Sequence, residues 1–157
     1  MKVTLLVVGK TDKKFVEEGI DEYVKRIKRY IPFEIKVLPD VKNTKNMPNE
    51  VQMEKEADAI LAALAGNQEV ILLDENGAEY TSVGFANFID KRLVMGQRDL
   101  TFIIGGPYGF SQRVRAVASG KLSLSKLTYS HQLVRVVFAE QLYRAFTIIR
   151  GEPYHHQ

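Results

Sequence analysis

The chain has 157 residues, 45% of them hydrophobic, a formal net charge of +3 and no cysteine. This length predicts one domain over residues 1–157, because two separate cores rarely fit in so short a chain. The lack of cysteine excludes disulfide bonds, iron–sulfur clusters, thiolate metal sites and catalysis by a cysteine nucleophile.

The first forty residues predict a strand, a helix and a second strand. Val3–Val8 is a continuous apolar, β-branched run, typical of a strand buried on both faces. The run is too short to span a membrane and lacks a signal-peptide cleavage site, so we expect a cytoplasmic protein. Residues 13–31 repeat apolar side chains at three- and four-residue spacing up to Pro32, which predicts an amphipathic helix. Glu34–Leu38 alternates polar and apolar residues, as a strand near a sheet edge does.

A long loop, a helix and a buried strand follow. Residues 40–48 are rich in Lys, Asn and Pro and predict a loop that is either functional or merely mobile. Asn49 is expected to cap a helix that ends at Gly66. Residues 69–74 are apolar up to a terminal aspartate and predict a buried strand, with a turn at Asn76-Gly77.

The second half continues the alternation of helices and strands. A helix should begin at residues 81–82 and end at Gly96, and residues 99–104 form the next strand. The pattern then predicts a short helix over residues 112–118 and a last strand over residues 122–125. Together these elements indicate an α/β fold with a mainly parallel sheet flanked by helices.

The final helical segment, residues 133–149, is apolar almost all round. Such a helix must be buried on every side, and one short chain can hardly surround it. We therefore predict a homodimer that packs through this helix. The alternative is a central helix covered within one protomer.

Ligands of open parallel sheets bind beyond the carboxyl ends of the strands, here near Leu73, Gly105 and residues 124–129. The sequence GGPYG at residues 105–109 lets a ligand approach the backbone closely. It matches neither the dinucleotide-binding nor the P-loop pattern, and no residue spacing predicts a metal site. The polar residues 123–131 could line a pocket or serve only to cap the last helix.

Several strings in the chain resemble the RlmH family of SPOUT-class methyltransferases of the large ribosomal subunit. They are VILLDENG, FIIGGPYG, LSLSKLTYSHQLVRVVFAEQLYRAF and RGEPYHH, so the resemblance is strongest in the C-terminal half. It implies a homodimer with a C-terminal trefoil knot that binds S-adenosyl-L-methionine and methylates N3 of a pseudouridine in 23S rRNA. A protein this small has little surface for reading sequence, so we expect it to act on the assembled ribosome.

The resemblance also implies roles for particular residues. It assigns cofactor binding to Leu73, Gly105, Leu124, Ser125, Lys126, Leu127, Thr128 and Tyr129. It places catalysis at Arg144, Tyr154 and His155, where the tail residues hold the base that removes the N3 proton. Candidates for this base are His155, His131 and water.

Two arginines and one other function leave alternatives open. Arg135 and Arg144 either contact phosphate groups or orient the tail, and the alternative is that they pair with Glu140 on their own helix. The five basic and two acidic residues of segment 121–157 either bind an anionic partner or form a solvated face. The alternative to an enzyme is a non-catalytic, ribosome-associated nucleotide-binding module.

Overall fold

The fold is built on one parallel sheet, seen in a computed structural model that describes residues 1–64, 66–96 and 98–156. In this described part of the chain, five strands pair in the order β2-β1-β4-β3-β5. They are β1 (Val3–Val8), β2 (Phe33–Leu38), β3 (Gln68–Glu79), β4 (Asp99–Ile104) and β5 (Gly120–Ser123). The α/β class and the parallel sheet confirm the prediction, and the trefoil knot stays a prediction.

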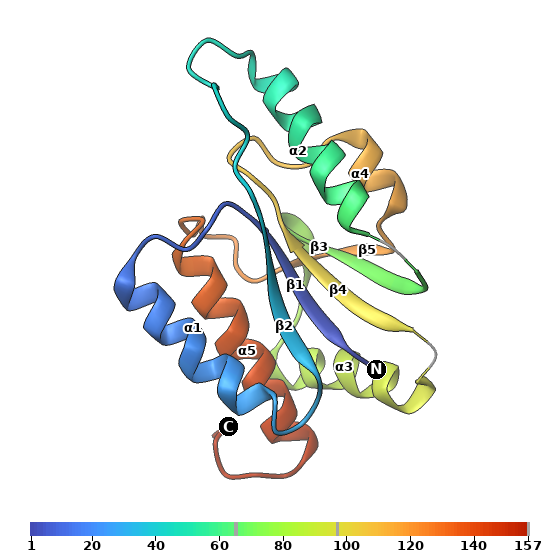
Figure 1. The fold of residues 1–157 in the computed structure, drawn as a ribbon. Coiled ribbons are helices and arrows are strands. Elements are labelled where there is room, and N and C mark those ends of the chain that lie inside the picture. The colour runs from blue at the N-terminus through green and yellow to red at the C-terminus, as the bar shows by residue number, and fades with distance from the viewer. Residues whose placement is uncertain (65, 97, 157) are drawn as a thin grey trace.

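Helices cover both faces of the sheet (Figure 1). They are α1 (Lys14–Ile27), α2 (Asn49–Ala63), α3 (Ser82–Met95), α4 (Gln112–Val117) and α5 (Leu133–Ile149). Leu5 and Val7 of β1 join the core beneath α1, α3 and α5, whereas Leu6 joins the core beneath α2 and α4. This division follows from the strand geometry, because successive side chains point to opposite faces.

Several element boundaries confirm the sequence pattern. Thr81 caps α3 by accepting a hydrogen bond from the N–H of Gly84 (2.9 Å), and Gly96 ends the helix with a left-handed φ of 59°. Two expectations were wrong. The first helix ends at Ile27 rather than at residue 31, because the chain turns there, and Asn49 lies inside α2 and makes no side-chain cap.

The turn expected at Asn76-Gly77 is instead part of β3. The pairing of β3 with β5 shifts register between Leu73 and Ala78. Asn76 and Gly77 therefore lie in an irregular stretch of the strand. A Cβ atom on Gly77 would lie 2.6 Å from the backbone nitrogen of Leu122. The glycine is therefore needed for the close approach of β5 rather than for a turn.

The last helix, α5, lies between α1 and α3 on one face of the sheet (Figure 1). Phe138 and Leu142 are fully buried, and the Phe138 ring packs 4.8 Å from that of Phe102 on β4. Seven residues of α5 are buried within one protomer, but apolar residues such as Val134 and Ile149 are only partly buried, so the homodimer through this helix stays a prediction. None of the described helices is long and apolar enough to cross a membrane.

Candidate functional site

A cavity of about 480 Å³ opens where the pairing of β3 with β4 ends, at Leu73 and Ile104, and beside the segment that follows β5. Its walls come from residues 73–76, from residues 104–110 and from the stretch between Leu124 and Val134. These are the three strand ends at which the sequence predicts a site. They converge because β3 pairs with both β4 and β5 in parallel, so their ends share one edge of the sheet.

Seven of the eight residues predicted to bind the cofactor line this cavity. They are Leu73, Gly105, Leu124, Ser125, Leu127, Thr128 and Tyr129. The eighth, Lys126, does not line it: its side chain is 84% exposed, and its ammonium group lies 3.7 Å from Glu79.

Local hydrogen bonds shape the segment that follows β5. The Ser123 hydroxyl donates to the carbonyl of Ser125 (3.0 Å), and the Ser125 hydroxyl accepts from the N–H of Leu127 (2.9 Å). Further along, the N–H of Leu133 donates to the Ser130 hydroxyl at the start of α5 (3.0 Å). The capping role left open for this segment is therefore present, and it coexists with the lining of the cavity.

The loop at residues 105–109 forms a second wall. The N–H of Gly109 donates to the carbonyl of Gly106 (3.2 Å), and Gly109 has a left-handed φ of 79° that favours glycine. A Cβ atom on Gly105 would lie 3.0 Å from the Phe110 ring. Glycine at position 105 therefore permits the close packing of Phe110 against this loop.

Asp74, at one of the predicted strand ends, forms an ion pair in the cavity wall with Arg115, a residue that no sequence motif singles out. Asp74 Oδ2 accepts from Arg115 Nη1 at 3.1 Å, and Asp74 Oδ1 accepts from the N–H of Asn76 at 2.9 Å. Burial acts to raise the pKa of the Asp74 carboxyl, but these two partners outweigh it and hold the pKa below its ordinary value. The cavity therefore offers a fixed negative and a fixed positive charge.

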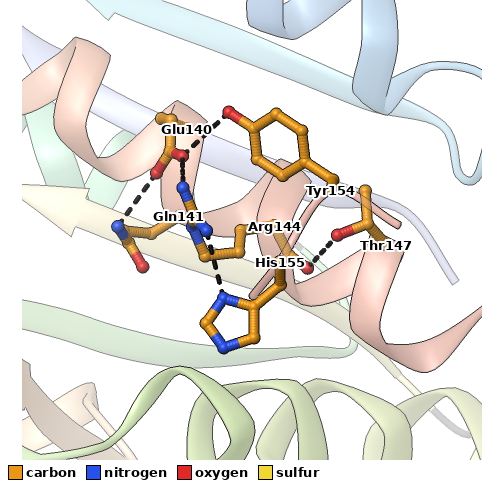
Figure 2. A network of polar contacts seen from close by, with 6 residues as sticks. All are labelled: Glu140, Gln141, Arg144, Thr147, Tyr154 and His155. Atoms are coloured by element: carbon orange, nitrogen blue, oxygen red, sulfur yellow. Dashed lines mark hydrogen bonds and ion pairs between the residues drawn. The ribbon is translucent and has the colours of Figure 1, made fainter. Parts of the chain in front are cut away.

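The predicted catalytic residues form a separate polar network on α5 and the C-terminal tail (Figure 2). Arg144 Nη2 donates to Glu140 Oε1 at 2.5 Å, while Arg144 Nη1 lies 3.0 Å from Nδ1 of His155. The Tyr154 hydroxyl donates to the same Glu140 oxygen at 3.0 Å. Arg144 thus pairs with Glu140 and also contacts the tail at His155, whereas its contact with phosphate groups stays a prediction.

Tyr154 is well placed to remain a hydrogen-bond donor. Burial, with hydrogen bonds to Tyr23 and Glu140, raises the pKa of its hydroxyl. Its ring meets the Tyr143 ring edge-on at 4.7 Å and lies 4.8 Å from the Arg144 guanidinium carbon. The network therefore fixes the tail against α5 by charge, hydrogen bonds and aromatic packing together.

The cavity lies beside the first turn of α5, whereas the network extends from the middle of α5 to the C-terminal tail. Val134 lines the cavity and Arg144 follows ten residues later, a separation of about 15 Å at 1.5 Å per helical residue. Of the three candidate bases, His131 lines the cavity and His155 belongs to the network. In the part of the chain that the structure describes, none of Arg144, Tyr154 and His155 lines the cavity.

Arg135 corrects another expectation. It is only 1% exposed and donates to the carbonyl of Val8 and to the Thr11 hydroxyl, both at 3.0 Å. Burial lowers the pKa of its guanidinium. A side chain so deeply enclosed does not contact RNA phosphates; it ties α5 to the end of β1 instead. Among the described residues, no group of acidic or histidine side chains could hold a metal ion.

Comparison with known proteins gives consistent matches over the whole chain. The family model described as "Predicted SPOUT methyltransferase" matches residues 1–155. The chain is 50% identical to the ribosomal RNA large subunit methyltransferase H of Flavobacterium johnsoniae. The proteins of the same name from Phocaeicola vulgatus and Porphyromonas gingivalis are 51% and 46% identical to it. Each of these three alignments covers all of both proteins.

Proposed function

The chain belongs to the SPOUT methyltransferase family, and we propose that it methylates N3 of a pseudouridine in 23S rRNA, with S-adenosyl-L-methionine as methyl donor. The observation that carries the proposal is the convergence of seven predicted cofactor residues on one cavity in a chain about 50% identical to ribosomal RNA methyltransferases. The pseudouridine base and its N3 atom are the finer details of this proposal. Those details come from the resemblance of the sequence motifs.

The cavity fits a donor of this kind. Its volume of about 480 Å³ lies within the range of small-molecule sites. Apolar side chains such as Leu73 and Leu124 suit an adenine ring, and the bare backbone at Gly105 suits its polar edge. The ion pair of Asp74 and Arg115 suits a ligand end that carries both an ammonium and a carboxylate group. The bound donor would supply an electrophilic methyl group.

This chain's residues then have to position the acceptor and remove its proton. Methyl transfer to nitrogen is an in-line displacement, so alignment of the two reactants supplies much of the acceleration. The N3 proton must leave to a base, for which His155, His131 and water remain the candidates. Arg144 and Tyr154 hold the tail and its imidazole in place.

A homodimer resolves the separation of about 15 Å along α5 between the cavity and the network. In a two-fold dimer, a contact from one part of the first protomer to another part of the second occurs twice, once in each direction. If two α5 helices pack against each other in opposite directions, the tail of each protomer meets the cavity of its partner. We therefore include a homodimer with two composite sites in the proposal.

An RNA substrate is supported by exposed lysines that follow β1 and β2, at the same edge of the parallel sheet as the cavity. Gln132, next to the cavity-lining His131, accepts from the N–H of Asp12 (3.0 Å) and donates to the carbonyl of Lys10 (3.3 Å). Lys10 is exposed, as are Lys42 and Lys45 in the loop that follows the neighbouring strand β2. Such lysines suit the phosphate backbone. A ribosomal substrate places the protein in the cytoplasm.

The test is transfer of labelled methyl from S-adenosyl-L-methionine to ribosomes that lack the modification, followed by digestion and mass spectrometry of the RNA. We expect one methylated pseudouridine in 23S rRNA, and no transfer to the same RNA stripped of protein. Donor binding without transfer to either substrate would favour the non-catalytic nucleotide-binding module. Efficient transfer to a short stem-loop would refute action on the assembled ribosome.

A further inference from the structure

Glu56 is a buried acid that neither the sequence motifs nor the proposed chemistry uses. It lies on α2, is only 4% exposed, and is followed directly by Ala57 of the core beneath α2 and α4. Its Oε1 atom has no hydrogen-bond partner among the described residues. A buried polar atom without a partner is costly, so its presence calls for an explanation.

The Glu56 carboxyl group lies against Gly106 of the loop that lines the cavity. A Cβ atom on Gly106 would lie 2.5 Å from Cδ of Glu56 and would also overlap both carboxyl oxygens. The carboxyl group thus occupies the place that a side chain on Gly106 would take. The loop has the cavity on one side and Glu56 of α2 on another.

Burial is the main influence on the pKa of this carboxyl group. Burial raises the pKa of Glu56, a hydrogen bond from Gln52 opposes that rise, and the nearby charge of Asp40 adds to it. A neutral carboxyl group is cheaper to bury than a carboxylate. The contact with Gly106 depends on the shape of the side chain, which glutamine shares.

We propose that Glu56 is a positioning residue for the cavity: its carboxyl group fills the space beside Gly106 and holds the loop at residues 105–109 in the shape that receives the methyl donor. The inference rests on the proposed function for the identity of this ligand. The loop has two glycines before its proline and a hydrogen bond from Gly109 to Gly106 across its turn. A support from α2 would keep this turn in place while the ligand is absent.

A pair of reciprocal substitutions tests the contact in the intact protein, with S-adenosyl-L-methionine binding measured by calorimetry. Gly106→Ala should weaken binding because its methyl group overlaps the Glu56 carboxyl group. Glu56→Ala should weaken binding roughly tenfold, because an unsupported loop must be ordered by the ligand. The double variant should bind more tightly than Gly106→Ala alone, since the new methyl group enters the vacated space.

Two further variants separate positioning from general stability. Glu56→Gln keeps the shape and should bind within about threefold of the wild type. Glu54→Ala removes an exposed acid of the same helix that bridges to Arg113 at 2.7 Å, and should leave binding unchanged. The proposal is overturned if the loss of donor affinity in the double variant equals the product of the losses in the two single variants. It is also overturned if Glu56→Gln binds the donor as weakly as Glu56→Ala.

Hydrogen exchange in the ligand-free protein separates this inference from the proposed function. Glu56→Ala should accelerate exchange of the Gly109 amide, whereas amides in the centre of β4 should exchange as in the wild type. If the wild type fails to bind the donor, the proposed function falls, and the exchange result alone decides the role of Glu56. An unchanged Gly109 amide would overturn that role.

Discussion

Arg144 on α5 and His155 in the tail are joined by a contact of 3.0 Å, although eleven positions separate them in the chain. The same guanidinium is held by Glu140 one turn earlier on the helix, which raises the pKa of Arg144 mainly through that hydrogen bond. Arg144 therefore anchors the tail, which has no regular secondary structure, to helix α5. The first prediction tests this link.

Arg144→Ala should abolish methylation while the protein keeps its fold and its affinity for the donor. The imidazole of His155 and the Tyr154 ring would lose their common support, and misplacement by about 1 Å can lower a rate roughly 100-fold. Methylation of modification-free ribosomes measures the rate, and calorimetry measures donor affinity. Arg150→Ala, at an exposed arginine beyond the end of α5, is the matched control and should remain active. Unchanged turnover by Arg144→Ala would reject its role.

Deletion of residues 153–157 should separate binding from catalysis. The deleted segment contains Tyr154 and His155, which contact the network on α5 but do not line the cavity. We expect wild-type donor affinity together with loss of methylation, measured on the same protein preparation. A fully active truncated protein would count against any function of the tail.

Mixing two inactive variants tests the composite site of the proposed homodimer. Arg144→Ala damages the network, and Gly105→Val damages the cavity because a Cβ atom there lies 3.0 Å from the Phe110 ring. After unfolding together and refolding in equal amounts, half of the dimers should be mixed and hold one intact site, which restores roughly a quarter of wild-type activity. No recovery would show that cavity and network act within one chain, and a monomer by sedimentation would reject the dimer itself.

The ion pair in the cavity predicts a pH dependence of stability. The pKa of Asp74 is lower in the folded protein than in the unfolded chain, so its contribution is complete above the ordinary aspartate range and is lost as pH falls through the folded pKa. Asp74→Asn should lower the free energy of unfolding by about 1–2 kcal/mol at pH 7. In urea titrations, this difference should shrink towards zero below about pH 3.9. A difference that is constant with pH would contradict the assignment.

Lysines in the loop after β2 should contribute to the use of ribosomes as substrate. Lys42→Glu combined with Lys45→Glu should lower methylation of ribosomes most strongly at low salt, because each lost phosphate contact reduces the salt dependence of binding. Donor affinity should not change. Lys25→Glu with Lys28→Glu, at the far end of α1, is the matched control. Equal effects of the two pairs would show that only net charge matters.

Much of the fold follows from local patterns that the sequence displays directly. The strand at residues 99–104 and the helix at residues 133–149 occur at the predicted bounds, since an apolar run or a helical repeat determines each. Thr81 and Gly96 end α3 as expected because a cap depends on the few residues next to it. The strand ends that converge on the cavity were also predictable from the parallel alternation of elements.

The rest depends on neighbours that are remote along the chain. Asn76-Gly77 has the composition of a turn, yet the backbone of β5 pairs with this stretch and keeps it in a strand. Arg135 has a side chain of the type that binds phosphate groups, yet it is buried and donates to Val8 and Thr11 instead. Periodicity within one segment carries no information about which distant backbone or side chain will lie against it.

The amino-acid sequence by itself therefore determined the fold class, the approximate elements and the edge of the sheet at which a ligand would bind. Only the tertiary structure placed Glu56 behind Gly106, paired Arg115 with Asp74, and separated the network of Arg144 from the cavity along α5. Local patterns arise from backbone geometry and burial over a few residues, whereas these contacts join groups from different elements. Their partners are set by how helices and strands pack, which no single stretch of sequence encodes.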